Sequence, residues 1–384
     1  MIKKSEKLSV GLVFDDSLDS NDGVAQYVKT LGAWLSSQGH EVDYLVGETI
    51  IKHWASGDVY SLSKNVNVRF NGNRLSMPLW ASLGPIKRLL SQRKYDVIHV
   101  MTPYSPLMAK RIINNASKGS VVVGTFHIFP SGKLSIYGSK LLRIWLGRSL
   151  RKFAGFISVS RSSADFAKSA YRIDSVVIPN PVDHKRFSNH STEISKPPTI
   201  VFLGRLVKRK GVAELIGAFA ELSTKEPDAR LVIAGDGPQR DFLVSKVERS
   251  GLSDKVKFLG YIKEEDKPGL LGSATIACFP SLYGEAFGIV LIEAMAAGSG
   301  VVLAGDNPGY RSVLGAQPKL LVDATDTSAF SSRIELLLSD ANLSRELHQW
   351  QTEAVKAYDI DRVGVQVVNF YHQQIARQAK KGNN

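Results

Sequence analysis

Short apolar runs and helical patterns alternate along the first half of the chain. Leu8–Phe14 is almost continuously apolar, which predicts a buried strand. After a polar loop, apolar side chains recur every three or four positions from Val24 to Leu35, which predicts a helix. Further strands are predicted at Glu41–Val46, Asp96–Val100, Ser120–Thr125 and Gly155–Ser160. Strands that alternate with helices favour an α/β fold with a parallel, doubly wound sheet.

The same pattern restarts after a polar linker at Ser188–Pro198. A final predicted helix, Arg362–Lys380, has no strand after it. The chain has 384 residues, which suits two domains rather than one. We therefore predict a first domain at 1–190, a second at 191–361, and a last helix with a basic tail at 362–384. The strands predicted for the second domain are Thr199–Leu203, Arg230–Ala234, Val256–Leu259, Ala274–Phe279 and Gly300–Ala304.

Two carboxylates, Glu285 and Glu293, stand eight positions apart near the end of the second domain. Glu285 is in a glycine-flanked turn, whereas Glu293 is in an apolar, helix-prone run. If the whole run were helical, they would lie about 12 Å apart. That separation exceeds the roughly 5–10 Å of a carboxylate pair that flanks one bond. It suits the two ends of an extended polar ligand such as a nucleotide sugar.

A glycine-bounded basic loop, 204–211, follows the first strand of the second domain. Arg205 and Lys210 could embrace a diphosphate, because phosphate recognition favours charge-assisted donors. Alternatively, Lys208, Arg209 and Lys210 could form one solvated basic loop. In the first domain, Gly23 opens the first predicted helix, where a glycine lets backbone amides approach a phosphate.

The positive charge is confined to the first half of the chain. The formal net charge is +13, and residues 1–190 hold 26 Lys and Arg against 13 Asp and Glu, whereas residues 191–384 hold 23 of each. Between Tyr60 and Ser160 the only acidic residue is Asp96. A one-sided field of this kind predicts an anionic partner surface, either a membrane or a nucleic acid.

Several classes of protein are disfavoured by the composition. A single cysteine, Cys278, excludes an internal disulfide and a multi-cysteine metal site. No run reaches the roughly 18 apolar residues that span a bilayer. The basic start of the chain leads directly into the first strand without a signal-peptide core, so we expect a cytoplasmic protein.

The segment 283–298 resembles the E-x7-E signature of the retaining glycosyltransferases of family 4, which have the GT-B fold. Further motif matches occur in the same order along almost the whole chain. The resemblance implies two Rossmann-like domains that face a cleft, with the last helix crossing back to the first domain. It also implies that Arg205 and Lys210 neutralise the leaving diphosphate in place of a metal ion, so that no metal site and no cofactor are expected.

The same resemblance assigns roles to other residues. Glu285 would face the sugar hydroxyls, and Glu293 would accept hydrogen bonds from the ribose. His127, in a Thr-Phe-His segment, would contact the donor sugar and the acceptor. Asp22 departs from the pattern, because the family usually has a second glycine there. The remaining donor-binding positions are Gly23 at the diphosphate, Gly235, Gly260 and Tyr261 around the nucleotide, and Phe287, Gly288 and Ile289 at the sugar and phosphates.

Other stretches resemble the phosphatidylinositol mannosyltransferase branch of the family. This likeness implies transfer of mannose from GDP-mannose to a membrane lipid such as phosphatidylinositol, by a peripheral enzyme on the inner face of the cell membrane. The segment 79–94 would contribute a basic membrane-facing helix, and 141–152 is a second amphipathic candidate. The basic edge of the first consists of Lys87, Arg88, Arg93 and Lys94.

Alternatives remain open at this point. Both basic segments could be ordinary helices with solvated cations. A soluble family 4 enzyme could use a UDP-sugar or another donor to build a polysaccharide or a small glycoside. A nucleic-acid partner is disfavoured, because the basic segments match no recognisable module and have few interleaved aromatic residues. The sequence does not fix the oligomeric state.

Overall fold

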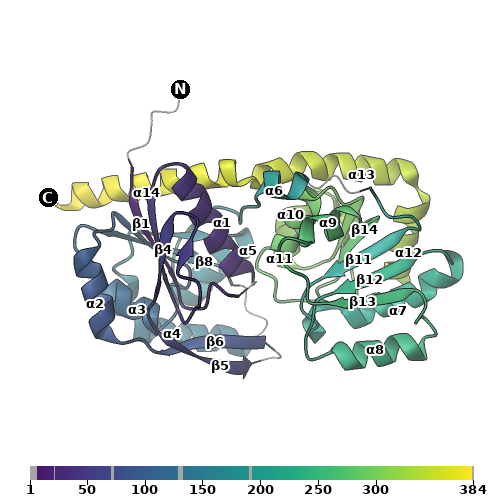
Figure 1. Ribbon diagram of the computed structural model, residues 1–384, viewed down its shortest axis with the longest axis horizontal. Helices are drawn as coiled ribbons and strands as arrows, with labels where there is room; N and C mark the ends of the chain where they lie inside the picture. Colours follow the sequence, from purple (N-terminus) through teal and green to yellow (C-terminus); the bar gives the residue numbers. More distant parts are fainter. Residues whose placement is uncertain (1–6, 21, 71–72, 129–132, 190–192, 383–384) are drawn as a thin grey trace. The chain divides into compact units, whose positions relative to one another are not determined.

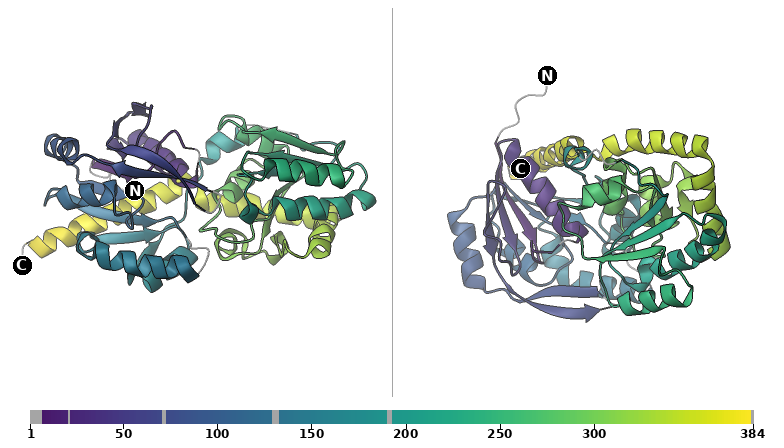
Figure 2. Two further views of the ribbon diagram at one scale, coloured as in Figure 1. Left: turned by 90° about the horizontal axis from the view of Figure 1, so that it is seen from below. Right: turned by 45° about the vertical axis from the view of Figure 1, so that its right-hand side comes forward.

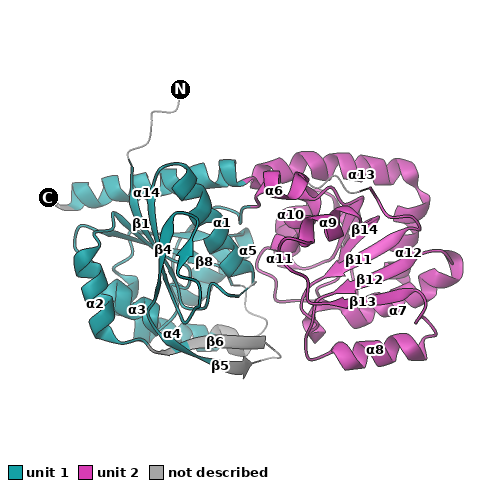
Figure 3. Ribbon diagram, viewed as in Figure 1, with its two compact units in different colours: residues 1–181, 360–384 teal, residues 182–359 magenta. Residues whose placement is uncertain are grey.

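The computed structural model describes residues 7–20, 22–70, 73–128, 133–189 and 193–382. The chain forms two compact units, residues 1–181 with 360–384 and residues 182–359 (Figure 3). Within the described residues, no helix combines the length and the apolar character needed to cross a membrane.

Unit 1 is built on an eight-stranded sheet in the order β10-β9-β8-β7-β1-β2-β4-β3 (Figure 1). All neighbouring strands are parallel except β3 and β4. The hairpin of β5 and β6 forms a separate sheet. The strands are β1 (Ser9–Phe14), β2 (Glu41–Val46), β3 (His53–Trp54), β4 (Gly57–Ser61), β5 (Lys64–Phe70), β6 (Asn73–Trp80), β7 (Val97–Val100), β8 (Val121–Phe126), β9 (Gly155–Ser158) and β10 (Val176–Val177).

Helices cover both faces of this sheet. One core cluster joins the sheet to α1 and α14, and a second joins it to α2 and α3. Trp34 of α1 donates its indole N–H to Asp361 of α14 at 2.8 Å, so α14 packs along α1 (Figure 2). The helices are α1 (Gly23–Ser37), α2 (Leu83–Gln92), α3 (Met108–Asn115), α4 (Lys133–Leu150), α5 (Arg161–Phe166), the π-helix η1 (Ala167–Tyr171) and α14 (Ile360–Gly382).

Unit 2 has a six-stranded parallel sheet in the order β13-β12-β11-β14-β15-β16. Its strands are β11 (Thr199–Leu203), β12 (Arg230–Ala234), β13 (Val256–Gly260), β14 (Ile276–Phe279), β15 (Val301–Gly305) and β16 (Leu321–Val322). Its helices are α6 (His184–Ser188), the 3₁₀ turn η2 (Lys208–Lys210), α7 (Val212–Lys225), α8 (Arg240–Arg249), α9 (Lys267–Gly272), α10 (Ile289–Ala296), α11 (Pro308–Leu314), the 3₁₀ turn η3 (Pro318–Leu320), α12 (Thr327–Ser339), α13 (Ala341–Ala354) and the 3₁₀ turn η4 (Val355–Tyr358).

The predicted fold class, two doubly wound Rossmann-like units, is confirmed. The ten predicted strands all form, with ends that differ from the prediction by no more than two residues. The units divide at 181/182 and 359/360, whereas the sequence suggested 190/191 and 361/362. The first boundary lies earlier in the chain than predicted, because α6 packs on α9 and α10 of unit 2, although the sequence placed it in the first domain.

Candidate active site

The loops that follow the two central strands of unit 2 meet at the carboxyl ends of those strands. β11 and β14 are neighbours. After β11 the chain continues to β12 on one side, and after β14 it continues to β15 on the other side, so the carboxyl ends of β11 and β14 form the topological switch point. The loops are 204–211 after β11 and 280–288 after β14. Leu282 donates its backbone N–H to the Arg209 carbonyl at 2.8 Å, so the two loops are joined directly.

Glu285 lies where these loops meet. Its Oε1 is 2.6 Å from Arg209 Nη1 and 2.9 Å from Lys210 Nζ. Its side chain is only 11% exposed. Burial alone would raise the pKa of Glu285, but Lys210 and Arg209, together with hydrogen bonds from Lys210 and Ser281, outweigh it and hold the pKa below its ordinary value. Glu285 is therefore an ionised carboxylate at neutral pH.

The cations of the loop 204–211 differ in how far they are exposed to solvent. Arg205 is partly buried and begins the turn, and its neighbour Leu206 donates its backbone N–H to the Asp236 carbonyl. Lys208 is exposed, although it stands between Arg205 and Lys210 in the sequence. The structure thus brings Lys210 and Arg209 together at Glu285 and leaves Lys208 in solvent.

Glu293 occupies a different environment on α10, where the residue is 6% exposed. Lys267 of α9 places its Nζ 3.7 Å from Glu293 Oε1 and 2.6 Å from Glu264 Oε1. Burial raises the pKa of Glu293, and Lys267 offsets this only in part. The two predicted carboxylates are therefore shifted in opposite directions.

The straight-helix spacing expected for these two carboxylates does not hold. α10 begins at Ile289, four residues after Glu285, so only Glu293 is on the helix. Gly288 is the residue that breaks the pattern. It has φ +100° at the N-cap of α10, and a Cβ there would press against the Tyr310 ring.

The remaining donor-binding residues predicted from sequence surround these loops. Gly235 has φ +127°, and its N–H donates to the Gly260 carbonyl at 2.6 Å at the end of β13. Tyr261, the next residue, is 65% exposed. The Phe287 side chain is buried and meets Tyr358 edge-on, with ring centroids 5.6 Å apart, so only its backbone can serve a ligand.

Gly23 of unit 1 is the first residue of α1, but the helix end is already occupied. Asp22 is the N-cap, and its Oδ1 accepts hydrogen bonds from the N–H groups of Val24 at 2.8 Å and Ala25 at 3.0 Å. A phosphate at this helix end would have to compete with the Asp22 carboxylate. Asp22, which stands where the family usually has a second glycine, therefore occupies the backbone amides that a phosphate would bind.

His127 follows β8 at the carboxyl edge of the unit 1 sheet. Its ring meets the Tyr27 ring edge-on with centroids 4.7 Å apart, and burial lowers its pKa to about 3, so the imidazole is neutral at pH 7. Its Nε2 has no hydrogen-bond partner among the described residues. His99 differs, because its two nitrogens lie 2.7 Å from Tyr371 Oη and 2.6 Å from Thr125 Oγ1 in the core.

Comparison with known proteins decides the family. Residues 21–186 match the family model "Glycosyltransferase Family 4", and residues 183–354 match "Glycosyl transferases group 1". The phosphatidyl-myo-inositol mannosyltransferase of Mycolicibacterium smegmatis is 30% identical, over 95% of this chain and 93% of its own. The chain belongs to glycosyltransferase family 4. It is therefore a glycosyltransferase.

Other relatives and solved structures agree with this family assignment. A phosphatidyl-myo-inositol mannosyltransferase of Mycobacterium tuberculosis is 30% identical over 95% of this chain and 96% of its own. A glycosyltransferase from Rickettsia africae superposes with a TM-score of 0.78 at 17% identity, covering 97% of this chain and 99% of that one. Anabaena HepE in complex with UDP-glucose gives 0.74 at 18% identity, with 95% and 99% covered. At these identities the structures show the GT-B fold.

The predicted basic edge of this glycosyltransferase is divided in the structure. α2 ends at Gln92, so Arg93 and Lys94 follow the helix instead of continuing its face. Lys87 and Arg88 are exposed on α2, and Lys94 is exposed beyond it. The apolar partners expected beside them, Ile86 and Leu89, are buried in the core of unit 1.

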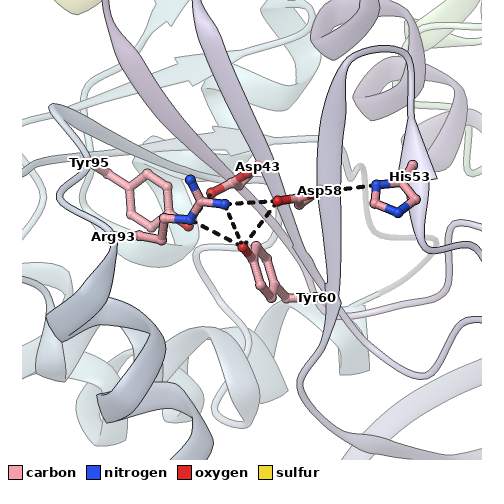
Figure 4. A network of polar contacts seen from close by, with 6 residues as sticks. All are labelled: Asp43, His53, Asp58, Tyr60, Arg93 and Tyr95. Carbon is pink, nitrogen blue, oxygen red and sulfur yellow. Dashed lines mark hydrogen bonds and ion pairs between the residues drawn. The ribbon is translucent and has the colours of Figure 1, made fainter.

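Arg93 is held by a polar network within unit 1 (Figure 4). Its Nη2 lies 2.8 Å from Asp58 Oδ2 and 3.0 Å from Tyr60 Oη, and its Nε lies 3.6 Å from Asp43 Oδ2. Tyr95 donates its hydroxyl to Asp43 at 2.8 Å. Arg93 thus links the end of α2 to β2 and β4, and its positive charge is paired with carboxylates of unit 1.

Two residues of this glycosyltransferase's site were missed by sequence reasoning. Arg209 was treated as one of several loop cations, and Lys267 was not considered. A signal existed for Arg209, because consecutive cations on a turn that lies beside a carboxylate loop can both reach it. Lys267 gave no such signal, since its contact with Glu293 depends on the packing of α9 against α10.

Proposed function

We propose that this enzyme transfers a hexose, in the first instance mannose from GDP-mannose, to a membrane lipid such as phosphatidylinositol. One observation carries the proposal: the similarity to proteins named phosphatidyl-myo-inositol mannosyltransferases extends over 95% of the chain and thus over both units. A likeness limited to residues 183–354 would favour only a shared donor. The likeness of unit 1 extends the argument to the acceptor.

In the proposed reaction the anomeric configuration is retained. The acceptor oxygen bonds to the anomeric carbon on the face from which the diphosphate leaves, and the leaving phosphate oxygen takes the acceptor proton. Arg205 and Lys210 stabilise the departing negative charge without a metal ion, which is the main catalytic contribution in this scheme. The mechanism needs no protein nucleophile and no cofactor.

The carboxylates have separate tasks in this scheme. Glu285, kept ionised by Lys210 and Arg209, accepts hydrogen bonds from sugar hydroxyls. Glu293 accepts hydrogen bonds from the ribose, and the backbone amides of Phe287, Gly288 and Ile289 approach the sugar and phosphates. Neutral His127, with Nε2 unpartnered among the described residues, contacts the sugar and the acceptor.

The proposal includes a location. We expect the enzyme to work as a peripheral protein at the cytoplasmic face of the membrane that holds its lipid acceptor. The excess of cations in residues 1–190 supports attachment to an anionic leaflet. No nucleic-acid partner is proposed.

The test is a panel of nucleotide sugars with purified protein and mixed phospholipid vesicles that contain phosphatidylinositol. We expect GDP release from GDP-mannose together with a mannosylated lipid. Lys210→Ala should lower kcat by about 10²–10³-fold, and Lys208→Ala, a matched change in the same loop, should leave it near wild type. Equal turnover in both variants would contradict the donor-site assignment.

A second outcome would favour a different substrate pair. Release from a UDP-sugar, or release without lipid product, would indicate a soluble enzyme that builds a polysaccharide or a small glycoside. The structural likeness to HepE, which was solved with UDP-glucose, keeps this alternative in the panel.

A further inference from the structure

α4 has apolar side chains on two opposite sides. On the inner side, Leu146 is buried where the helix packs against α3 and η1. On the outer side, four large apolar side chains are mostly exposed. This set, called here the α4 stripe, consists of Tyr137 (68% exposed), Leu141 (72%), Ile144 (72%) and Trp145 (60%).

The α4 stripe forms one continuous band. Its positions are related as i, i+4, i+7 and i+8, which at about 100° per residue places them within an arc of about 100°. Soluble proteins rarely leave a contiguous apolar surface of this kind without a partner. α2 provides the contrast, since Ile86 and Leu89 are buried and, of its remaining leucines, only Leu83 is exposed, to 40%.

Cations border the α4 stripe. Lys110 Nζ lies 4.0 Å from the centre of the Trp145 ring, and Lys140 Nζ lies 5.6 Å from the centre of the Tyr137 ring. Arg148, one turn beyond Ile144, is exposed. Between Asp96 and Asp165 the sequence has no acidic residue. An apolar band with an aromatic residue at each end and a basic border matches the interface of an anionic bilayer.

The border charges argue against a second copy of the chain as the occupant. Two α4 stripes placed face to face would bring Lys110, Lys140 and Arg148 of both copies together, and like charges that meet at an interface oppose association. Anionic phospholipid head groups instead supply the opposite charge, while the upper acyl chains accept the apolar side chains.

We propose that the α4 stripe inserts into the head-group region of an anionic phospholipid leaflet and is the main membrane-docking surface of this enzyme. The inference rests on the proposed lipid acceptor and moves the docking element from the end of α2 to α4. Lys87 and Arg88 then contribute long-range attraction without insertion, because Ile86 and Leu89 on the same helix are buried and α2 presents no apolar band like the α4 stripe.

The experiment measures binding of the full chain to vesicles of phosphatidylglycerol and phosphatidylcholine. The double variant Leu141→Gln with Ile144→Gln should lower the partition coefficient by about 100-fold or more, since each of the two substitutions removes one inserted aliphatic side chain. Leu336→Gln, at a 41% exposed position on α12 of unit 2, is the matched control and should bind as wild type. Circular dichroism verifies that both variants fold.

A second readout locates the insertion. Vesicles with brominated acyl chains should quench part of the tryptophan fluorescence, and Trp145→Phe should remove most of that quenching. Unchanged partitioning of the double variant, or quenching that survives Trp145→Phe, would overturn the proposal. A wild-type dimer in sedimentation that the double variant abolishes, without loss of vesicle binding, would assign the stripe to a second copy.

Failure of this inference is distinguishable from failure of the proposed function. Transfer of mannose to a detergent-solubilised lipid acceptor tests the function without requiring docking. Intact transfer in detergent with unaltered vesicle binding by the double variant would overturn only the α4 stripe. Stripe-dependent vesicle binding without transfer from any nucleotide sugar would overturn only the function.

Discussion

The two units share a doubly wound topology but distribute their charges differently. In unit 2, Arg209 and Lys210 at the switch point share one carboxylate, that of Glu285, which holds both cations in place and leaves a net positive charge. In unit 1 the cations around α4 stand in a stretch that has no acidic residue between Asp96 and Asp165. Cations held in place by a shared, largely buried carboxylate form a small, fixed positive site that suits a small anionic ligand. A field of exposed cations beside apolar side chains instead favours an extended anionic surface.

The largest effect is expected where Arg209 and Lys210 meet Glu285 in unit 2. Glu285→Gln removes the negative charge that the two cations share and replaces the charged acceptor proposed for the sugar hydroxyls by a weaker amide oxygen. We expect kcat to fall by about 10²–10³-fold, because a preorganised charge at the reacting group is lost. Single-turnover release of the nucleotide diphosphate is the measurement.

A surface ion pair supplies the control for this variant. Glu335 on α12 lies 2.6 Å from Lys225 Nζ, with side chains 34% and 52% exposed. Glu335→Gln should leave turnover unchanged and should lower the unfolding free energy by less than about 1 kcal/mol. Turnover of Glu285→Gln within a factor of two of wild type would remove the contrast between the two units.

A smaller effect separates the cations of unit 1 from one another. Arg93→Ala should lower the unfolding free energy by about 1 kcal/mol, since it releases Asp58 and partly buried Asp43. Arg88→Ala, at an exposed position on α2, should have a smaller effect on stability. Urea denaturation gives both values.

The same pair should behave differently on vesicles. Because Arg93 is held by Asp58 and Tyr60, its loss should weaken vesicle binding less than the loss of Arg88. Stronger dependence on Arg93 than on Arg88 would show that the network of Figure 4 opens at the membrane, and would restore the edge predicted from sequence.

The sequence predicted the elements better than the contacts between them. Short apolar runs located the strands, because a parallel strand that is buried on both faces is almost continuously apolar. The glycine-flanked turn at Glu285 and the helix at Glu293 were both recognisable. The sequence placed Arg209 among the cations of the loop, but which of these cations pair with Glu285 depends on how two loops meet after the sheet has formed.

The sequence also did not show which apolar side chains of an amphipathic segment are buried in the fold. Segments 79–94 and 141–152 both combine cations with apolar residues, yet Ile86 and Leu89 of α2 are buried, whereas four large apolar side chains on α4 are mostly exposed. Which side of a helix packs on a sheet is settled by neighbours such as α3, which lie elsewhere in the chain. The hydrophobic pattern alone therefore makes both segments candidates for a membrane-facing helix and does not distinguish between them.

The smallest expected effect is a difference in pH dependence between the two carboxylates of unit 2. The pKa of Glu285 is lowered in the folded state, so its contribution to stability is present above the ordinary glutamate pKa and is lost as the pH falls through the lowered value. The pKa of Glu293 is raised, mainly by burial, so the folded state loses stability as the pH rises from the ordinary value through the raised one.

Replacing each carboxylate by glutamine should therefore change the pH profile with opposite sign. As the pH rises from the lowered pKa of Glu285 to the ordinary glutamate pKa of about 4.3, Glu285→Gln should become progressively less stable than wild type, and the deficit should stay constant above it. As the pH rises further, from the ordinary value through the raised pKa of Glu293, Glu293→Gln should gain relative to wild type, with Lys267 still paired to Glu264 at 2.6 Å. Urea midpoints at a series of pH values provide the comparison. Slopes of the same sign would mean that the two sites share one electrostatic environment, and the separate tasks proposed for the two carboxylates would lose their physical basis.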